Sequence, residues 1–344
     1  MSIKQNDTGL TQMAENVLAN YNIAPDQIRL IQNKGLKTLW EVAFKGRRMC
    51  LKRLRHSVDK AMFSVYAQVY IYNNGGNVPA VHLNRENNAI TQYMDHLFVL
   101  YEWIEGRDLN FSDAFDLRLA MEGLARFHKA SVGYRPPAEA RTSSKLGKWP
   151  GQYRSMRDNM AKWKNLSMSK AGQQGYRSYL KHVDSVIEMA DIAIKALDAS
   201  PYSAAASVDN EQCPLCHQDY GEGNALLSEK GVFVLDLDGV TYDLPARDLR
   251  KLIGKQMEDN GWTDKSIASQ ILGSYEKNNG LSKQEKEILK IDLLFPHWFF
   301  AEVKNLFKKN KPVEDSKIER AARMEQAKFT MLQHNIGDII VISG

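Results

Sequence analysis

The segment from His217 to Asp238 constrains this chain more than any other part of it. It begins with His217-Gln218-Asp219-Tyr220-Gly221-Glu222-Gly223-Asn224 and, after an apolar patch and a short turn, ends with Val232-Phe233-Val234-Leu235-Asp236-Leu237-Asp238. This pattern predicts a polar loop followed by an apolar strand that ends in two acids.

Asp219, Asn224 and Asp236 have the residue types, and the order along the chain, that phosphoryl transfer requires. One carboxylate orients or deprotonates an acceptor hydroxyl, an amide oxygen and a second carboxylate hold Mg²⁺, and a lysine contacts the phosphates of a nucleotide. The alternative is an ordinary polar loop, and a His-x-Asp pair alone is common. The complete string is much more specific, so a nucleotide-dependent phosphotransferase is the working hypothesis.

A suitable lysine lies upstream, in a region that predicts a small β-rich lobe. Strands are expected over residues 28–32, 39–44 and 49–54, with a turn at 33–38 and a hairpin at 45–48. Because side chains alternate between the two faces of a strand, Lys52 shares a face with Cys50 and Leu54. Lys52 is therefore expected to point beneath the first turn, where phosphates would lie.

The first turn is poor in glycine. Loops that bind phosphate normally carry several glycines, which let the backbone approach the ligand closely. Here Gly35 is the one glycine between Asn33 and Thr38, and the small Thr38 assists it. Lys37 is an additional source of positive charge in this turn.

A helix is expected after the lysine strand, capped by Ser57 and continuing to Ile71. Kinases carry an acid on this helix that pairs with the lysine. At the corresponding position this chain has the neutral Gln68. Two possibilities stay open: Gln68 hydrogen-bonds Lys52, or Lys52 lacks an acidic partner.

The first lobe is expected to end near residue 103. Two strands near 78–83 and 88–94 precede an apolar strand over 97–103, which runs into a hinge-like Glu102-Trp103-Ile104-Glu105-Gly106. We expect Glu102, Trp103 and Ile104 to meet the adenine edge of a nucleotide. Residues 1–103 then form the β-rich nucleotide-binding lobe, and residues 104–344 the lobe that carries the catalytic loop and the metal-binding strand.

The second lobe is predicted to be mainly helical, with helices over 113–130, 153–166, 175–197, 248–259, 264–278, 282–294, 298–309 and 314–334. Acids of this lobe, including Asp259, Asp292 and Glu302, are candidates to line an acceptor pocket. The expected fold class is α+β: a two-lobed, protein-kinase-like fold with a small antiparallel sheet and a larger helical lobe.

These pieces in this order resemble the aminoglycoside/choline-phosphotransferase branch of the protein-kinase-like fold. Three segments are most similar to the spore-coat kinase-like proteins of the CotS family, namely residues 216–224, 236–249 and 295–300. The resemblance covers nearly the whole chain, from about residue 10 to about residue 335, and it is looser in the glycine-poor turn.

The resemblance implies ATP and Mg²⁺ as cofactors, Asp219 as the catalytic base and Lys52 as the phosphate lysine. It implies metal contacts from Asn224, Asp236 and Asp238. It also implies that Asp248 is a structural acid that braces the catalytic loop. Synthesis in the cytoplasm of the mother cell, assembly on the spore coat and other coat proteins as partners follow from the family, whereas the hydroxyl acceptor, a small molecule or a saccharide, is not specified.

Composition restricts the classes of partner. The 344 residues include 43% apolar residues, and 46 basic against 41 acidic side chains give a mild net charge of +5. No segment suits nucleic acid binding, and none approaches the roughly 20 apolar residues of a membrane span. A polar N-terminus without a secretory core predicts cytoplasmic synthesis. The cluster Lys304, Lys308, Lys309 and Lys311 is interpreted as a solvated face, with an anionic ligand or surface as the alternative.

Cys213-Pro214-Leu215-Cys216-His217 matches the pattern of covalent haem attachment, and its two cysteines also suggest zinc or thiol redox chemistry. Haem attachment requires export, and a closed zinc site requires four ligands. Cys50 is the only other cysteine. We expect Cys213 and Cys216 to pack as small apolar groups, with a disulfide between them left open.

The main alternative is a catalytically weak or inactive kinase-like protein that serves as a structural or binding component of the coat. The glycine-poor turn and Gln68 favour it. Asp219, Asn224 and Asp236 oppose it, because neighbouring carboxylates that hold no cation repel each other.

Overall fold

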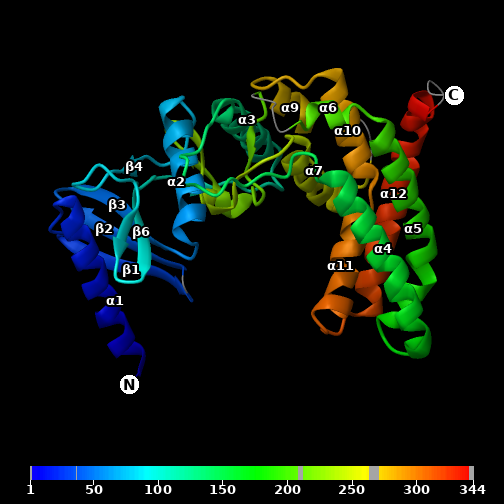
Figure 1. Ribbon diagram of the computed structural model, residues 1–344, viewed down its shortest axis with the longest axis horizontal. Coiled ribbons are helices and arrows are strands. Elements are labelled where there is room, and N and C mark those ends of the chain that lie inside the picture. Colours follow the sequence, from blue (N-terminus) through cyan, green and yellow to red (C-terminus); the bar gives the residue numbers. More distant parts are fainter. Residues whose placement is uncertain (1, 36, 208–211, 263–270, 341–344) are drawn as a thin grey trace. The chain divides into compact units, whose positions relative to one another are not determined.

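The computed structural model describes residues 2–35, 37–207, 212–262 and 271–340. The chain forms two compact units, both visible in Figure 1. Unit 1 contains residues 1–144, 214–242 and 277–279, and unit 2 contains residues 145–213, 243–276 and 280–344. The lobe boundary after residue 103 stays a prediction.

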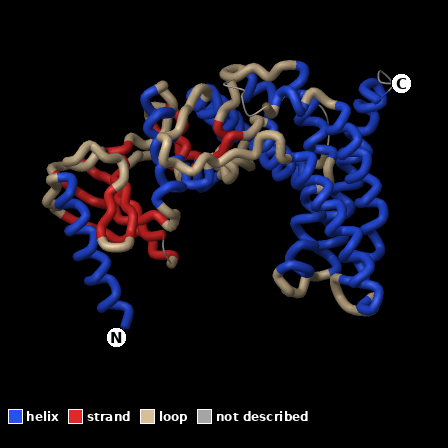
Figure 2. Tube along the Cα trace, in the orientation of Figure 1, coloured by secondary structure: helices blue, strands red, loops and turns tan. Residues whose placement is uncertain are grey.

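Unit 1 begins with helix α1 (Ser2–Leu18) and an antiparallel sheet. Its strands run in the order β1 (Gln27–Lys34), β2 (Lys37–Phe44), β3 (Arg47–Leu54), β6 (His96–Glu102) and β4 (Val81–His82), and β5 (Thr91–Tyr93) also pairs with β6. These are the strands drawn in red beside α1 in Figure 2. The predicted strands are confirmed, although β4 and β5 are shorter than expected.

The two faces of this sheet pack against different helices. On one face, Trp40 and Leu51 form a buried cluster with Ala14 and Val17 of α1. On the other face, the buried residues of the sheet, such as Val99, pack against helix α2 (Val58–Asn73). The alternation predicted for β3 is confirmed, because Leu51 belongs to the first cluster and Leu54 to the second.

Helix α1 was not predicted from the sequence. Its buried residues Ala14, Val17 and Leu18 recur at helical spacing. The chain before them is polar, which hides a short apolar stripe in the average composition. The stripe becomes stable only because it covers a face of the sheet.

The remainder of unit 1 carries the segment from His217 to Asp238. Helix α3 (Ala114–Ser131) packs against a sheet of β10 (Gly231–Val234), β9 (Ala225–Ser228) and β7 (Arg107–Asp108), and β8 (Leu215–Cys216) pairs with β11 (Thr241–Tyr242). A Cβ atom at Gly123 would lie 2.8 Å from Val232 Cγ1. Glycine at this position therefore allows α3 to approach β10 closely.

Unit 2 is helical. Its helices are α4 (Trp149–Ser167), α5 (Tyr176–Ala199), α6 (Tyr202–Ala205), α7 (Ala246–Asn260), α9 (Gly273–Glu276), α10 (Lys283–Leu294), α11 (His297–Lys308) and α12 (Asp315–Ile340). Helix α5 packs against α4, α10 and α12. The predicted helices are confirmed except over 264–278, where residues 263–270 lie outside the described residues. None of the described helices has the length and apolar character needed to cross a membrane.

Candidate active site

His217 joins the polar loop to the strand that follows it. The side chain is fully buried, its Nε2 lies 2.8 Å from the carbonyl oxygen of Leu235, and its Nδ1 lies 3.3 Å from the backbone nitrogen of Asp219. A carbonyl can only accept and a backbone N–H can only donate, so the imidazole carries its proton on Nε2 and is neutral. His217 therefore holds Asp219 in a defined position relative to the residue before Asp236.

Asn224 makes a second connection between the same two segments. It ends a short 3-10 helix (Glu222–Asn224), where its Nδ2 donates to the backbone carbonyl of Asp219 at 2.8 Å. The backbone carbonyl of Asn224 accepts from the N–H of Leu235 at 3.0 Å. The segments that carry Asp219, Asn224 and Asp236, the three residues predicted for catalysis and metal binding, thus lie side by side.

Unit 1 anchors this loop through polar contacts. The Tyr220 hydroxyl donates to the carbonyl of Ala120 in α3 at 2.7 Å, and a carboxylate oxygen of Glu222 accepts from the Phe111 N–H at 3.0 Å. Two residues adopt left-handed backbone conformations although they are not glycine, with φ of +73° at Gln218 and +60° at Asp236. Such conformations are costly and concentrate at functional sites, where the surrounding structure holds them in place.

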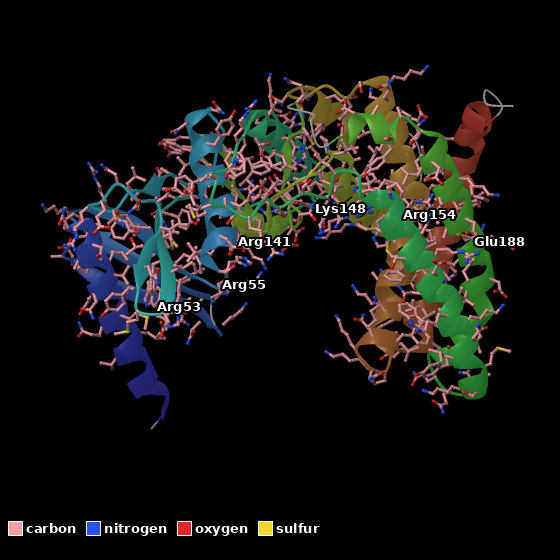
Figure 3. The ribbon with its side chains drawn as sticks, viewed as in Figure 1. Arg53, Arg55, Arg141, Lys148, Arg154 and Glu188 are labelled. Atoms are coloured by element: carbon pink, nitrogen blue, oxygen red, sulfur yellow. The ribbon has the colours of Figure 1, made fainter. Side chains whose placement is uncertain are left out.

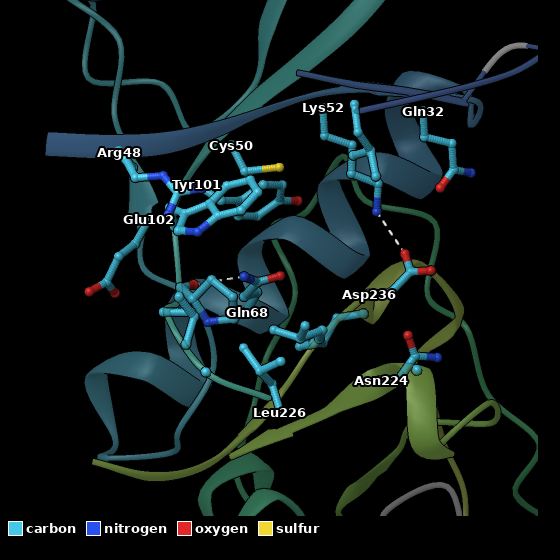
Figure 4. A pocket seen from close by; sticks show the side chains of 18 of the residues that line it. Gln32, Arg48, Cys50, Lys52, Gln68, Tyr101, Glu102, Asn224, Leu226 and Asp236 are labelled. Atoms are coloured by element: carbon cyan, nitrogen blue, oxygen red, sulfur yellow. Dashed lines mark hydrogen bonds and ion pairs between the residues drawn. The ribbon is translucent and has the colours of Figure 1, made fainter. Parts of the chain in front are cut away.

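Lys52 pairs with both acids at the end of the strand. Its Nζ lies 2.8 Å from Asp236 Oδ1 and 2.6 Å from Asp238 Oδ1, and the residue is only 5% exposed. Gln68 instead donates to the carbonyl of Pro79 at 2.7 Å. The question left open by the sequence is thereby answered: Lys52 has acidic partners, and they come from the strand end rather than from α2 (Figure 4).

Lys37 occupies the other oxygen of Asp236. Its Nζ lies 2.7 Å from Asp236 Oδ2, so each carboxylate oxygen of Asp236 faces a lysine. Burial alone would raise the pKa of Asp236, but Lys52 and Lys37 hold that pKa well below its usual range. Burial alone would lower the pKa of Lys52, but the Asp238 and Asp236 carboxylates raise it. Both groups are therefore charged at neutral pH.

A cavity of about 450 Å³ opens beside these charges, entirely within unit 1. Its lining includes six of the predicted site residues, namely Lys52, Glu102, Trp103, Ile104, Asn224 and Asp236. Apolar walls are supplied by residues such as Leu39, Leu226 and Leu235. This combination of an apolar body with a few charged groups at one place is typical of ligand sites.

The other predicted site residues, Gly35, Thr38, Asp219 and Asp238, are not among the described residues that line the cavity. Gly35 has φ of +62°, and its carbonyl accepts from Arg53 Nη2 at 2.8 Å. The fully buried Thr38 donates to Asn33 Oδ1 at 3.3 Å. Contacts from Gly35 and Thr38 to a cofactor stay predictions.

Arg48 and Lys37 belong to the cavity but were not among the predicted site residues. The Arg48 guanidinium lies 4.5 Å from the centroid of a Trp103 ring and pairs with Glu41 and Glu105. The guanidinium and the indole together form a polarisable wall at the end of β6. Arg48 lies on β3, and its partner Glu105 is 57 residues further along the chain, so the local sequence does not indicate this arrangement.

The two cysteines of the motif pack in the interior of the protein, as predicted. Cys213 and Cys216 are buried free thiols, and burial raises the pKa of Cys213 to about 12. Little thiolate is therefore present at neutral pH. Both ring nitrogens of His217 are already hydrogen-bonded within the chain, which opposes a role as a metal or haem ligand.

Three acids predicted for the helical lobe have different outcomes. Asp292 is buried and pairs with Arg250 at 2.9 Å, so it is a structural residue rather than part of an open acceptor pocket. The Asp259 side chain lies outside the described residues. Asp248 is buried in α7, and its bracing role stays a prediction.

Comparison with known sequences identifies relatives over most of the chain. The family model described as "Spore coat putative kinase YutH" matches residues 16–334. Spore coat protein S of Bacillus subtilis (strain 168) is 28% identical over 290 residues, which is 84% of this chain and 83% of that protein.

Solved structures share the fold at low sequence identity. An aminoglycoside phosphotransferase from Alicyclobacillus acidocaldarius aligns with a TM-score of 0.76 and 17% identity, covering 94% of this chain and 96% of that one. Spectinomycin phosphotransferase, solved with ADP and spectinomycin, aligns with a TM-score of 0.57 and 15% identity over 92% of this chain and 98% of that one. The chain thus has the α+β, protein-kinase-like fold predicted from its sequence.

Proposed function

Because the chain belongs to the family of spore coat kinase-like proteins, we propose that it is an ATP- and Mg²⁺-dependent phosphotransferase that acts on a hydroxyl acceptor during formation of the spore coat. One observation carries the proposal. Lys52 is held between Asp236 and Asp238 at the edge of a cavity that Asn224 also lines. A lysine, an amide oxygen and a carboxylate in one cavity are the groups that phosphoryl transfer requires.

The side chains around Asp236 fit Mg²⁺. This ion prefers carboxylate and carbonyl oxygens, and proteins usually supply one or two carboxylates while the substrate phosphates and water complete the coordination. Asp236 would hold the ion, with the amide oxygen of Asn224 and the carboxylate of Asp238 as further ligands. The Nδ2 of Asn224 is directed to the Asp219 carbonyl, so its amide oxygen is the atom left for a cation. When bound, Mg²⁺ supplies positive charge that offsets the charge of the nucleotide phosphates.

The cavity also suits a nucleotide. Its volume of about 450 Å³ lies in the range of small-molecule sites. The Arg48–Trp103 wall and the backbone near Glu102 and Ile104 would contact the adenine base. Lys37 and Lys52 would contact the phosphates, exchanging part of their pairing with Asp236 for phosphate oxygens. Spectinomycin phosphotransferase, which has the same fold, has been solved with ADP.

Asp219 would act on the acceptor. The acceptor oxygen attacks the γ-phosphorus, the bond from that phosphorus to the bridging oxygen of ADP breaks, and the hydroxyl proton passes to the Asp219 carboxylate. His217 would position Asp219 through the hydrogen bond between its ring and the Asp219 backbone. Most of the rate would come from this positioning and from the fixed charges of Lys37 and Lys52.

A second candidate function is that of a coat protein that holds nucleotide without turnover. Two observations favour it. The turn between β1 and β2 has a single glycine, and both oxygens of Asp236 are paired with lysines rather than left open. Entry of a metal ion must compete with those pairs.

The two functions are separated by measuring Mg²⁺-ATP binding and ATP consumption on the same preparation. Binding is followed by calorimetry, and consumption is followed against sugars, amino alcohols and extracts of spore coats. We expect binding together with ADP release for at least one acceptor. Binding without ADP release across the panel favours the second function, and absence of binding contradicts both.

A further inference from the structure

Unit 2 contains a cavity of its own, with a volume of about 850 Å³, between α4, α7 and α11. Its lining includes six basic side chains, namely Lys148, Arg247, Arg250, Lys251, Lys304 and Lys308. Among the described residues that line it there is no aspartate or glutamate. The whole chain has nearly equal numbers of basic and acidic side chains, 46 and 41, so this is a local concentration of positive charge.

Helical spacing explains how these charges converge. Arg247 and Arg250 are three residues apart on α7, and Lys304 and Lys308 are four residues apart on α11. Residues at such spacings share one face of a helix. Lys148 precedes the first turn of α4 and adds charge from the third helix. The cavity is thus lined by the basic faces of separate elements.

Three basic residues on α4 that lie outside the cavity lining, Arg154, Arg157 and Lys164, have acidic partners. Arg154 pairs with Asp198, and Arg157 pairs with Asp191 at 2.8 Å (Lys148 and Arg154 are labelled in Figure 3). By contrast, Lys304 makes no hydrogen bond or ion pair with any described residue, and the buried Nε of Arg247 has no hydrogen-bond partner there. At the cavity, Lys304 and the Nε of Arg247 therefore keep donors that no described residue occupies, whereas Arg250 is paired with Asp292.

The base of the cavity is held in place by buried groups. Arg250 donates to Asp292 at 2.9 Å and contacts His297, and Tyr153 donates to the same carboxylate oxygen of Asp292. This pairing uses one nitrogen of Arg250 and fixes its guanidinium, so the cationic wall is preorganised.

The cavity does not offer the ring of Trp298 as a surface on which a ligand could stack. The ring of Trp298 is packed so closely on Gly254 that a Cβ at residue 254 would lie 1.7 Å from Cζ2. Lys328 Nζ lies 4.6 Å from the centroid of the same ring. Trp298 is committed to packing within unit 2, so recognition by this cavity rests on charge.

We infer that this cavity binds a small polyanion, a molecule with at least two phosphate or carboxylate groups. Positive side chains that face one another across a cavity repel, and their combined field attracts anions to it. A ligand with several anionic groups relieves this repulsion at several points, and lysine and arginine both donate to phosphate and carboxylate oxygens. The inference stands on unit 2 alone and does not depend on the proposed function of unit 1.

The test is calorimetric titration of the full-length protein with tripolyphosphate, with citrate and with the uncharged sugar trehalose, in magnesium-free buffer. We expect binding of at least one of the two anions and none of trehalose. The ratio of the two anion affinities distinguishes a phosphate ligand from a carboxylate ligand. The double variant Lys304→Gln/Lys308→Gln should weaken binding by about tenfold or more, since each lost hydrogen bond to a charged group has about this effect.

A matched control is available on the same stretch of chain. Lys309 and Lys311 are exposed and do not line the cavity, so Lys309→Gln/Lys311→Gln removes the same charge without touching the site. This control should bind the anion within about twofold of the parent, as expected for screened surface charges. Thermal unfolding of all variants verifies that they are folded.

Three results would overturn the inference. One is equal weakening by the two double variants, which would indicate attraction to net charge only. A second is loss of anion binding in Lys37→Gln but not in Lys304→Gln/Lys308→Gln, which would place the anion in the cavity of unit 1. Absence of binding by both anions would also contradict it. Because these titrations contain neither ATP nor Mg²⁺, none of these results contradicts the phosphotransferase proposal.

Discussion

In the cavity of unit 1, lysine Nζ atoms lie within 2.8 Å of the carboxylates of Asp236 and Asp238, whereas basic side chains line the cavity of unit 2 without an acid among the described lining residues. Under the proposed function, charges of both signs in the first site would hold a metal ion and an anion together. Charges of one sign allow the second site to hold an anion alone. The two proposals together imply that the ligand of a site depends less on the number of lysines than on the acids placed beside them.

The largest expected effect tests the role of Asp219 in unit 1. Asp219→Asn should lower kcat by about 1,000-fold, because general bases typically contribute between a hundredfold and ten-thousandfold. Affinity for Mg²⁺-ATP should stay within about twofold, since Asp219 does not line the cavity. Turnover is measured by ADP release, and Glu229→Gln, an exposed acid in the β9–β10 turn, is the control. Normal turnover in Asp219→Asn would show that another group takes the proton.

The second test removes the carboxylate of Asp236, which pairs with both Lys37 and Lys52 in the cavity of unit 1. Asp236→Asn should weaken Mg²⁺-ATP binding by about 100-fold, since even residues that only support a metal ligand cost up to that amount. Lys52 keeps its pair with Asp238, so the variant should remain folded. Calorimetry with and without Mg²⁺ measures the effect. Parent-like affinity in the presence of Mg²⁺ would show that Asp236 does not hold the metal ion.

A third test uses pH to distinguish the two units. Burial and the neighbouring Arg250 lower the pKa of His297 in unit 2 to about 3. The unfolded chain has a histidine pKa near 6.5, so between about pH 6.5 and pH 3 the unfolded state binds a proton that the folded state does not. The free energy of unfolding should therefore fall as pH decreases through this range, by about 1.4 kcal/mol per pH unit well inside the range.

The measurement is chemical denaturation at pH 7, 6 and 5, followed by circular dichroism. In His297→Gln the contribution of this residue to the pH dependence should disappear, and His96→Gln, on strand β6 of unit 1, is the control for loss of a histidine. Identical pH dependence in the parent and in His297→Gln would contradict the assignment of a buried neutral imidazole.

The smallest effect is expected at Lys37. Lys37→Gln should raise the KM for ATP by about three- to tenfold with little change in kcat, because the lost charge-assisted contact is partly exposed and Lys52 remains. Initial rates over a range of ATP concentrations measure the change. A large fall in kcat with unchanged KM would mean that Lys37 acts mainly on the transition state.

The local sequence pattern was sufficient to predict much of the structure of unit 1. The alternation of β3 placed Lys52 on the correct face, and the positions of the strands from β1 to β6 along the chain followed from turns and apolar runs. Helix α1 was missed because its apolar stripe is short and becomes stable only on the sheet. The partners of Lys52 were also missed, since Asp236 lies 184 residues away and Asp238 lies 186 residues away.

The basic cavity of unit 2 was not predicted from the sequence, for a related reason. Lys304 and Lys308 were read together with Lys309 and Lys311 as a solvated face, but only the first two line the cavity. Helical spacing places Lys304 and Lys308 on one face of α11 and so distinguishes them, in principle, from Lys309 and Lys311. Nothing in the local pattern, however, indicates that Arg247 and Lys148, from other helices, meet the same cavity.

The sequence by itself determined which residues are available for chemistry, Asp219, Asn224, Asp236 and Lys52, and on which kind of element each lies. Spacing and polarity act over a few residues, and they were enough for this. The tertiary structure decided how charges are paired: two lysines on Asp236 in one cavity, and basic faces from three helices around the other. Electrostatic pairing depends on distances through space, and these are set only when elements far apart in the chain pack together.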